Sequence, residues 1–291
     1  MSSYNRFNPF VKQESYSPAA LWSHKILTTL SWLLLVVTSF YYSLHAPDDD
    51  KVDWRHTIWE VNRIYHTAYS LNAIIVEIYW VVLFILQIGY ISHLFSSNAE
   101  YVLAAANVGS HFILNNLLQF AFVMLFVRSH FIWAEVILIV NFANLVLLYL
   151  RYPSTVRFIH IPVVSAPLAW TFIAIFWNGA IAVNSDTLAA DIVAYIAIWG
   201  ILALGFFFLV VFKDYSIGFA FSILTAALGV KQFHLKTSPL QWIFAFAIMA
   251  ALFLASLALA IPAALGKEIR FRREEPAPES EAERAPLLDD H

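Results

Sequence analysis

Long apolar runs separated by short polar segments dominate the hydrophobic pattern of the chain. Eight runs approach or exceed the roughly 20 residues of helix that cross a bilayer core, namely 26–44, 72–95, 104–127, 131–150, 158–183, 188–212, 215–233 and 240–265. The run at 215–233 is short and contains two glycines, so whether it crosses fully stays open. Most connections are only a few residues long, which makes consecutive helices antiparallel. The pattern predicts an all-α fold, a polytopic transmembrane helical bundle of about eight spans.

Composition places the chain among membrane proteins. Hydrophobic residues make up 60% and charged residues 13%, whereas soluble domains have about 45–50% and about 25%. The chain has no cysteine, which excludes a disulfide, a thiolate nucleophile and a cysteine metal site. No basic patch is interleaved with exposed aromatic residues, so we expect membrane lipid and no nucleic acid as a partner.

The runs divide the chain into four parts. They are a cytosolic N-terminal segment (1–25), a five-helix core (26–183), three additional transmembrane helices (184–265) and a charged, Pro- and Glu-rich tail (266–291) that we expect to be disordered and cytosolic. The polar residues before the first run are too many for a signal peptide, so the first helix is expected to stay in the mature protein. Of the 17 Lys and Arg, eleven fall on the side of both termini and six on the other, which predicts that both termini are cytosolic.

One connection, residues 45–71, is long enough to carry structure of its own. Trp54 and Trp59 occur in it together with Ile58, Asn62 and Tyr65 at helical spacing. This spacing predicts a short interfacial helix that lies over the bundle as a lid. The alternative is a solvated loop whose two tryptophans anchor it at the membrane surface.

Polar and aromatic residues inside the core runs indicate a candidate site. Trp170 and Trp177 share a helix face seven residues apart, with Asn178 beside them. Unpaired amides are costly in hydrocarbon, so these groups should converge. One interpretation is a ligand pocket with aromatic walls and a few polar groups. The other is that the amides only hold helices together, at about 0.6 kcal/mol per pair. The candidate ligand-binding residues are Trp80, Asn115, Asn116, Gln119, Trp170, Ala174, Trp177 and Asn178.

Nothing in the sequence indicates catalysis. Glu77 and Glu135 are carboxylates within predicted spans, where an acid is a functional candidate unless it reaches the interface. The ten histidines form no tight metal-binding spacing, no serine sits in a nucleophile-elbow sequence, and no glycine-rich phosphate loop occurs. We therefore predict no enzyme, no catalytic residue and no metal site. Matched broken helices and internal duplication are absent too, which makes a transporter the alternative rather than the first interpretation.

The core runs resemble the tryptophan-rich sensory protein family, also called TspO/MBR or translocator proteins. Trp170, Ala174 and Asn178 match its Trp-x-x-Phe-Ala-x-x-Leu-Asn signature, with Ile173 and Trp177 in place of Phe and Leu. Trp80 matches the tryptophan of its Phe-x-x-x-Trp-x-x-x-Tyr helix, with Val76 and Phe84 in place of Phe and Tyr. Asn115 or Asn116 supplies the amide of its Leu-Asn-x-x-Trp helix, but the tryptophan of that motif is missing. The Trp-x-Pro-Pro motif of the family's first loop is absent.

The resemblance covers residues 26–183, and the whole chain resembles larger, mostly uncharacterised multi-spanning relatives found in fungi and bacteria. Residues 206–232 resemble the extra helices of those relatives. The resemblance implies binding of a flat hydrophobic ligand such as a porphyrin, haem or a sterol, and a homodimer. It leaves open whether binding serves transport, sensing or breakdown. We expect a sensor- or translocator-like binding protein, with a small-solute transporter or a scaffold without ligand as alternatives.

The tail carries a sorting pattern. Glu283 precedes Leu287 and Leu288 as in the acidic dileucine signals that clathrin adaptors bind on cytosolic tails. This pattern predicts an endosomal or vacuolar, lysosome-like membrane as the location. A second short pattern, Asn-Pro-Phe at residues 8–10, resembles peptides bound by endocytic adaptor domains.

Overall fold

A computed structural model describes residues 10–48, 55–152, 156–185 and 187–266 of the chain. In these residues eight helical segments are long and apolar enough to cross a membrane, which confirms the predicted all-α bundle of eight spans. Single helices form the spans α1 (Pro18–Leu44), α3 (Ala73–His93), α4 (Ala99–Phe126), α5 (Phe131–Arg151), α10 (Tyr215–Leu235) and α11 (Gln241–Ala264). The short seventh run is thus part of a continuous helix of 21 residues.

Two spans are composite. The fifth consists of α6 (Arg157–His160), a π-helical turn η2 (Ile161–Ser165) and α7 (Ala166–Val183). Pro162 in the turn and Pro167 in the first turn of α7 have no backbone N–H to donate, which favours an irregular hydrogen-bond pattern here. The sixth consists of α8 (Leu188–Ala197) and α9 (Trp199–Val211).

Capping residues set where several helices begin. Ser17 accepts a hydrogen bond from the Ala20 amide, and Pro18 occupies the first helical position, where its missing N–H costs nothing. As a result α1 begins before the apolar run does. Asn72 caps α3 through the Ile75 amide in the same way. For α1 the polar cap lies outside the hydrophobic pattern, so the pattern places this helix start too late, whereas the predicted start of α3 lies within one residue of the observed one.

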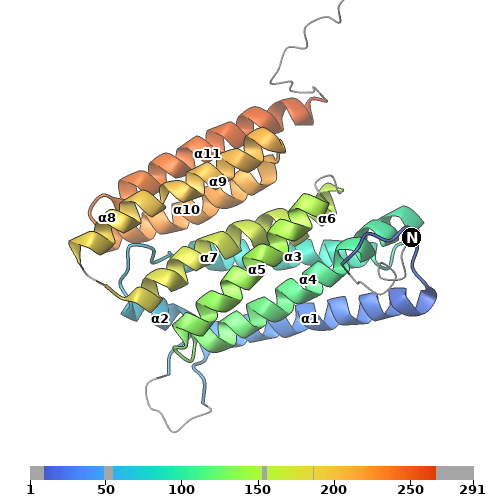
Figure 1. The fold of residues 1–291 in the computed structure, drawn as a ribbon, viewed down its shortest axis with the longest axis horizontal. Coiled ribbons are helices and arrows are strands. Elements are labelled where there is room, and N and C mark those ends of the chain that lie inside the picture. Colours follow the sequence, from blue (N-terminus) through green and yellow to red (C-terminus); the bar gives the residue numbers. More distant parts are fainter. Residues whose placement is uncertain (1–9, 49–54, 153–155, 186, 267–291) are drawn as a thin grey trace, which may run out of the picture.

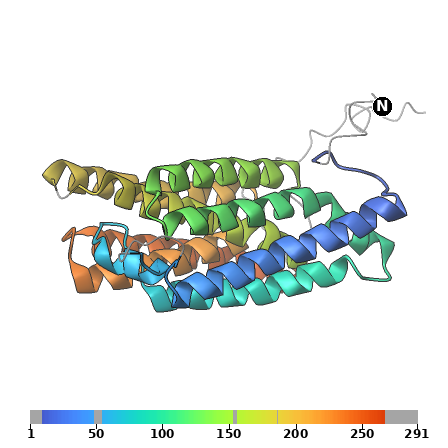
Figure 2. The ribbon, with the colours of Figure 1, turned by 90° about the horizontal axis from the view of Figure 1, so that it is seen from below.

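The spans form two groups (Figure 1). In the first, α1 packs against α4, α4 against α5, and α5 against α7; in the second, α9, α10 and α11 pack on one another. Helix α10 connects the groups because it also contacts α7 and α3. The view from below shows the helices running roughly along one axis, as expected for a bundle that crosses a membrane (Figure 2). The most buried span is the fifth, which lies between both groups.

The long connection contains the short helix α2 (Ile58–Ile64). Thr57 accepts from the Glu60 amide while Glu60 accepts from the Thr57 amide, which is a complete capping box. The hydrogen bond to the Thr57 backbone lowers the pKa of Glu60 below its ordinary value, and His56 and Arg63 add to the effect. Trp54 lies outside the described residues, whereas Trp59 packs against the core.

Candidate functional site

A cavity of about 340 Å³ lies in the first group of helices, with residues of α1, α2, α3, α4 and α7 in its lining. Its volume falls at the lower end of the range of small-molecule pockets. We call it the aromatic cavity, because eight of its lining residues are Phe40, Trp59, Trp80, Phe84, Phe122, Phe126, Trp170 and Trp177. The other lining residues include Ser39, Ser43, Glu77 and Gln119, which are polar, and Leu35, Leu44, Ile58, Val76, Val81 and Val123.

The structure brings four of the eight candidate ligand-binding residues to this cavity. These are Trp80, Gln119, Trp170 and Trp177, and the predicted lid residue Trp59 lines it as well. Glu77, Trp80 and Phe84 lie together in the lining, as their spacing on one helix face requires. The candidates Asn115, Asn116, Ala174 and Asn178 are buried but are not part of the lining.

The four indoles of the cavity form a connected cluster. Trp80 and Trp170 meet edge to face with ring centroids 5.4 Å apart, and Trp170 and Trp177 are 6.0 Å apart. Trp59 of α2 stacks on Trp177 at 6.1 Å with an interplanar angle of 25°. Such geometries are favourable for aromatic pairs. The cluster therefore gives the cavity two planar walls from α3 and α7 and a planar cover from α2.

Trp177 is held in place by a hydrogen bond that connects α7 with the lid segment. Its Nε1 donates to Asn62 Oδ1 at 2.9 Å. Asn62 is 2% exposed and also pairs with both backbone groups of Leu71, donating at 2.8 Å and accepting at 3.0 Å. Sequence spacing had placed Asn62 on the expected lid helix, but its partner Trp177 is 115 positions away.

Unlike the indole N–H of Trp177, those of two other lining tryptophans have no hydrogen-bond acceptor in the described residues. Trp59 Nε1 and Trp170 Nε1 are buried, and no acceptor for either occurs among the residues that the structure describes. An indole N–H can only donate, and leaving a buried donor unpaired costs about 1–3 kcal/mol. An acceptor atom on a bound molecule would remove this cost.

Charge in the cavity is of one sign. Glu77 is the only charged lining residue, and no Lys, Arg or His of the described part lines the cavity. Carboxylate groups of a ligand would find no cation here and would be repelled by Glu77. The lining thus suits an uncharged or amine-bearing molecule.

Polar side chains form a row along α4 that ends at the cavity. Asn107, His111, Asn115 and Gln119 recur every four residues and therefore share one face of the helix. Each bonds a different neighbour: Asn107 bonds the Gln13 backbone and Tyr16, His111 bonds Asn144, Asn115 accepts from Asn141, and Gln119 bonds Thr171. The row extends from the N-terminal segment to the wall of the aromatic cavity.

Asn116 and Asn178 have separate roles in helix packing. Asn116 Nδ2 donates to Ser31 Oγ of α1 at 3.3 Å. Asn178 Nδ2 donates to the Phe131 carbonyl at 2.9 Å and to Glu135 Oε2 at 2.8 Å. These contacts agree with the interpretation that some of the amides hold helices together.

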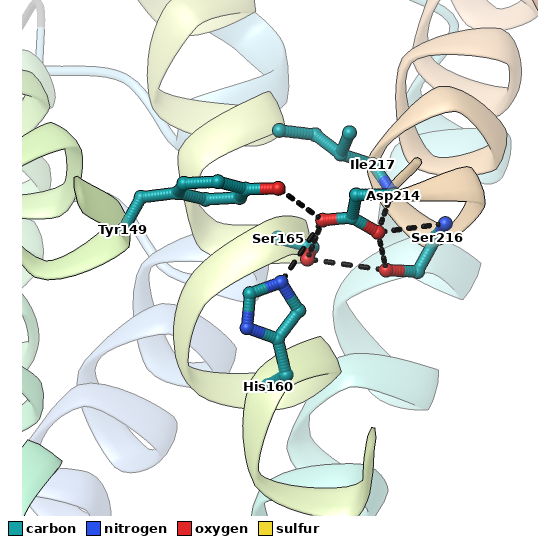
Figure 3. A network of polar contacts seen from close by, with 6 residues as sticks. All are labelled: Tyr149, His160, Ser165, Asp214, Ser216 and Ile217. Carbon is teal, nitrogen blue, oxygen red and sulfur yellow. Dashed lines mark hydrogen bonds and ion pairs between the residues drawn. The ribbon is translucent and has the colours of Figure 1, made fainter. Parts of the chain in front are cut away.

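A second polar cluster lies where the two helix groups meet (Figure 3). Asp214, in the loop before α10, accepts at Oδ2 from Tyr149 at 3.0 Å, from His160 Nε2 at 2.9 Å and from Ser165 at 2.8 Å. Its Oδ1 accepts from the Ser216 hydroxyl and from the backbone amides of Ser216 and Ile217, so it also caps α10. We call this set the Asp214 cluster.

The surroundings of Asp214 favour its ionised carboxylate over the protonated acid. Burial alone would raise the pKa of Asp214, but the hydrogen bond and charge of His160, and the hydroxyls of Ser216 and Ser165, together hold this pKa well below its ordinary value. No pattern in the sequence indicates the cluster. Asp214 stood in a short connection, and its partners Tyr149 and His160 are 65 and 54 residues away.

The cluster is not a hydrolase triad, because the Ser165 hydroxyl donates to Asp214 rather than to His160. Within the described ranges no group of three or more His, Asp or Glu residues is placed to hold a metal ion.

These features define a multi-pass integral membrane protein with an internal cavity. Residues 191–288 match the model of a family described as "Fungal protein of unknown function (DUF1774)". No curated protein and no solved structure matches the chain. The comparisons thus agree with the expected similarity to uncharacterised fungal proteins in the C-terminal helices. They give no support to the resemblance of residues 26–183 to tryptophan-rich sensory proteins.

Proposed function

We propose that this integral membrane protein binds a flat, uncharged hydrophobic molecule in the aromatic cavity and does not catalyse a reaction on it. The observation that carries the proposal is the pair of buried indole N–H groups of Trp59 and Trp170, which have no acceptor among the described residues, in a mostly apolar lining. A ligand with a planar apolar body stacks on the indole faces, and an oxygen on it accepts from one indole.

Ligand charge separates the two classes named by the sequence resemblance. A sterol has a flat ring system, one hydroxyl and no charge, which fits a lining whose single charge is that of Glu77. Porphyrins and haem carry carboxylates, for which the lining offers no cation. We therefore favour a sterol-like ligand over a porphyrin.

The test is a titration of detergent-purified protein with a fluorescent sterol and with protoporphyrin, followed by quenching of tryptophan emission. Trp170→Phe keeps an aromatic ring but removes the N–H, so we expect about two- to twelvefold weaker sterol binding for about 0.5–1.5 kcal/mol lost. The matched control is Trp133→Phe, because Trp133 is 66% exposed on α5 and does not line the cavity. Equal affinities of the two variants, or no saturable sterol binding, would refute the proposal.

A second candidate function is transport of a small solute, which the polar row on α4 favours. The row connects the cavity wall at Gln119 to the opposite end of the bundle at Asn107. Flux of a solute into proteoliposomes that Asn115→Leu abolishes would support transport. Sterol binding without flux would support the first proposal alone.

For location we propose the endosomal or vacuolar membrane, with both termini cytosolic and a clathrin adaptor as the partner of the tail. Glu283, Leu287 and Leu288 lie outside the described residues, so this proposal rests on the sequence. Replacing both leucines with alanine should move a tagged protein to the cell surface. An unchanged location would remove the dileucine proposal.

A further inference from the structure

A second cavity, with a volume of about 600 Å³, lies apart from the aromatic cavity. It lies between α7 and α8, at the end of the bundle where their connecting loop is, and we call it the α7–α8 groove. In Figure 1, α7 lies with the first group of helices, while α8 lies with the second. Residues of both helices and of the loop between them line the groove.

The walls of the groove are apolar and their side chains are small. Helix α7 contributes Ile175, Phe176, Gly179, Ala180 and Val183, and α8 contributes Ala189, Ala190, Val193, Ala194 and Ala197. Val183 is 73% exposed and Val193 is 64% exposed, so the groove is continuous with the lipid-facing surface. Within the hydrocarbon, apolar walls of this kind are in contact with acyl chains rather than with water.

The inner end of the groove is closed by an aromatic contact. Tyr69 stacks on Phe176 with centroids 5.1 Å apart and an angle of 22°, and its hydroxyl donates to the Ala194 carbonyl at 3.0 Å. Tyr69 therefore joins α7 to α8 at a fixed depth. The apolar side chains of both helices around this contact suit an acyl chain.

The rim of the groove is polar and carries a negative charge. It consists of Asn184, Ser185, Thr187, Asp191, Thr237, Ser238, His66 and Thr67. Among the described residues of the lining, Asp191 is the only carboxylate, and none of them is Lys or Arg. Ser238, which is fully buried, donates to Asp191 Oδ1 and holds the carboxylate in place. A carboxylate among hydroxyls and an imidazole complements an ammonium group next to a phosphate.

We propose that the α7–α8 groove binds a phosphatidylethanolamine molecule, with one acyl chain between the helices and the headgroup at the rim. The ammonium group donates to Asp191, and the hydroxyls of Thr187 and Thr237 donate to the phosphate. A primary ammonium keeps three N–H donors, which a choline head lacks, and a phosphatidylglycerol head offers Asp191 no cation. This site is separate from the aromatic cavity and does not depend on the function proposed for it.

The test is native mass spectrometry of the full chain released from nanodiscs that contain equal amounts of phosphatidylethanolamine, phosphatidylcholine and phosphatidylglycerol. We expect one retained phosphatidylethanolamine per chain, favoured at least fivefold over either other lipid. Asp191→Asn should reduce this preference to less than twofold. Ala190→Trp should fill the groove and abolish retention of any lipid.

Two control variants keep the outcome interpretable. Val140→Trp adds the same indole at a lipid-facing position of α5 that is 48% exposed and not part of the groove, and Glu100→Gln removes an exposed carboxylate elsewhere. Both should retain phosphatidylethanolamine as the unchanged chain does. Equal retention in Ala190→Trp and Val140→Trp would overturn the proposal, and so would a preference for phosphatidylglycerol or an unchanged preference in Asp191→Asn. Sterol titration of the same variants reports separately on the aromatic cavity.

Discussion

The Asp214 cluster should contribute measurably to the stability of the whole bundle, because it joins α5, α6 and η2 of the first helix group to α10 of the second. Replacing Asp214 with alanine removes the acceptor of three buried side-chain donors, those of Tyr149, His160 and Ser165. It also removes the cap of α10. No other single residue of the described chain accepts as many hydrogen bonds.

The size of the effect can be worked from these contacts. Three side-chain hydrogen bonds at the average of about 0.6 kcal/mol measured in a membrane protein give about 2 kcal/mol, and the lost cap adds about 1 kcal/mol. Leaving a buried donor without an acceptor costs about 1–3 kcal/mol, so the three unpaired donors can raise the total further. We therefore expect Asp214→Ala to lower the free energy of unfolding by about 3–5 kcal/mol. Asp214→Asn keeps a cap and one acceptor, so we expect about 2 kcal/mol.

The assay is unfolding in mixed micelles by titration with sodium dodecyl sulfate, followed by tryptophan emission. Glu14→Gln is the matched control, since it neutralises a carboxylate on an exposed residue and should change the free energy by less than about 0.5 kcal/mol. If Asp214→Ala unfolds within that margin of the control, the cluster does not hold the two helix groups together.

The same cluster gives a pH dependence with a definite sign. The pKa of Asp214 is lowered in the folded chain, so its stabilisation is present above the ordinary carboxyl pKa and is lost as the pH falls through that value toward the folded one. Acidification from about pH 5 to about pH 3 should therefore narrow the stability difference between the unchanged chain and Asp214→Asn. A difference that widens on acidification would contradict the assigned charge state.

Substitutions at three other contacts have predictable effects. Asn62→Ala removes the acceptor of the Trp177 indole, so it should lower the free energy of unfolding by about 1–3 kcal/mol in the same titration and weaken sterol binding. Thr57→Ala breaks the capping box of α2 and should destabilise that helix by about 1 kcal/mol, seen as faster amide hydrogen exchange in α2 alone. Gly218→Ala places a methyl group against Ser256 Oγ, where α10 meets α11, and should cost about 1–3 kcal/mol of unfolding free energy.

Controls for these changes come from the same chain. Gly89→Ala is matched to Gly218→Ala, because a methyl group at Gly89 meets no atom within 4 Å, and it should be neutral or stabilising. Equal effects at the two glycines would show that close packing of α10 on α11 is not the cause. If amide hydrogen exchange in Thr57→Ala increases throughout the first helix group and not only in α2, the cap stabilises more than its own helix.

Local features of the sequence determined the spans and part of the site. A helix that crosses a bilayer needs a continuous apolar segment of about 20 residues. Such a segment consists of consecutive residues, so the eight helices could be predicted from the sequence alone. Helical spacing likewise placed Glu77, Trp80 and Phe84 on one face, and all three line the aromatic cavity. Trp170 and Trp177 reached the cavity for the same reason.

The tertiary structure alone decided which polar groups meet. Asn116 and Asn178 looked similar to Gln119 in sequence, yet only Gln119 lines the cavity, because the other two pair with α1 and α5. Asp214 looked like a residue of a short loop until packing brought His160 to it. A hydrogen bond depends on a few tenths of an ångström between helices distant in sequence. Hydrophobic periodicity shows which side of a helix is apolar, but not which partner faces it.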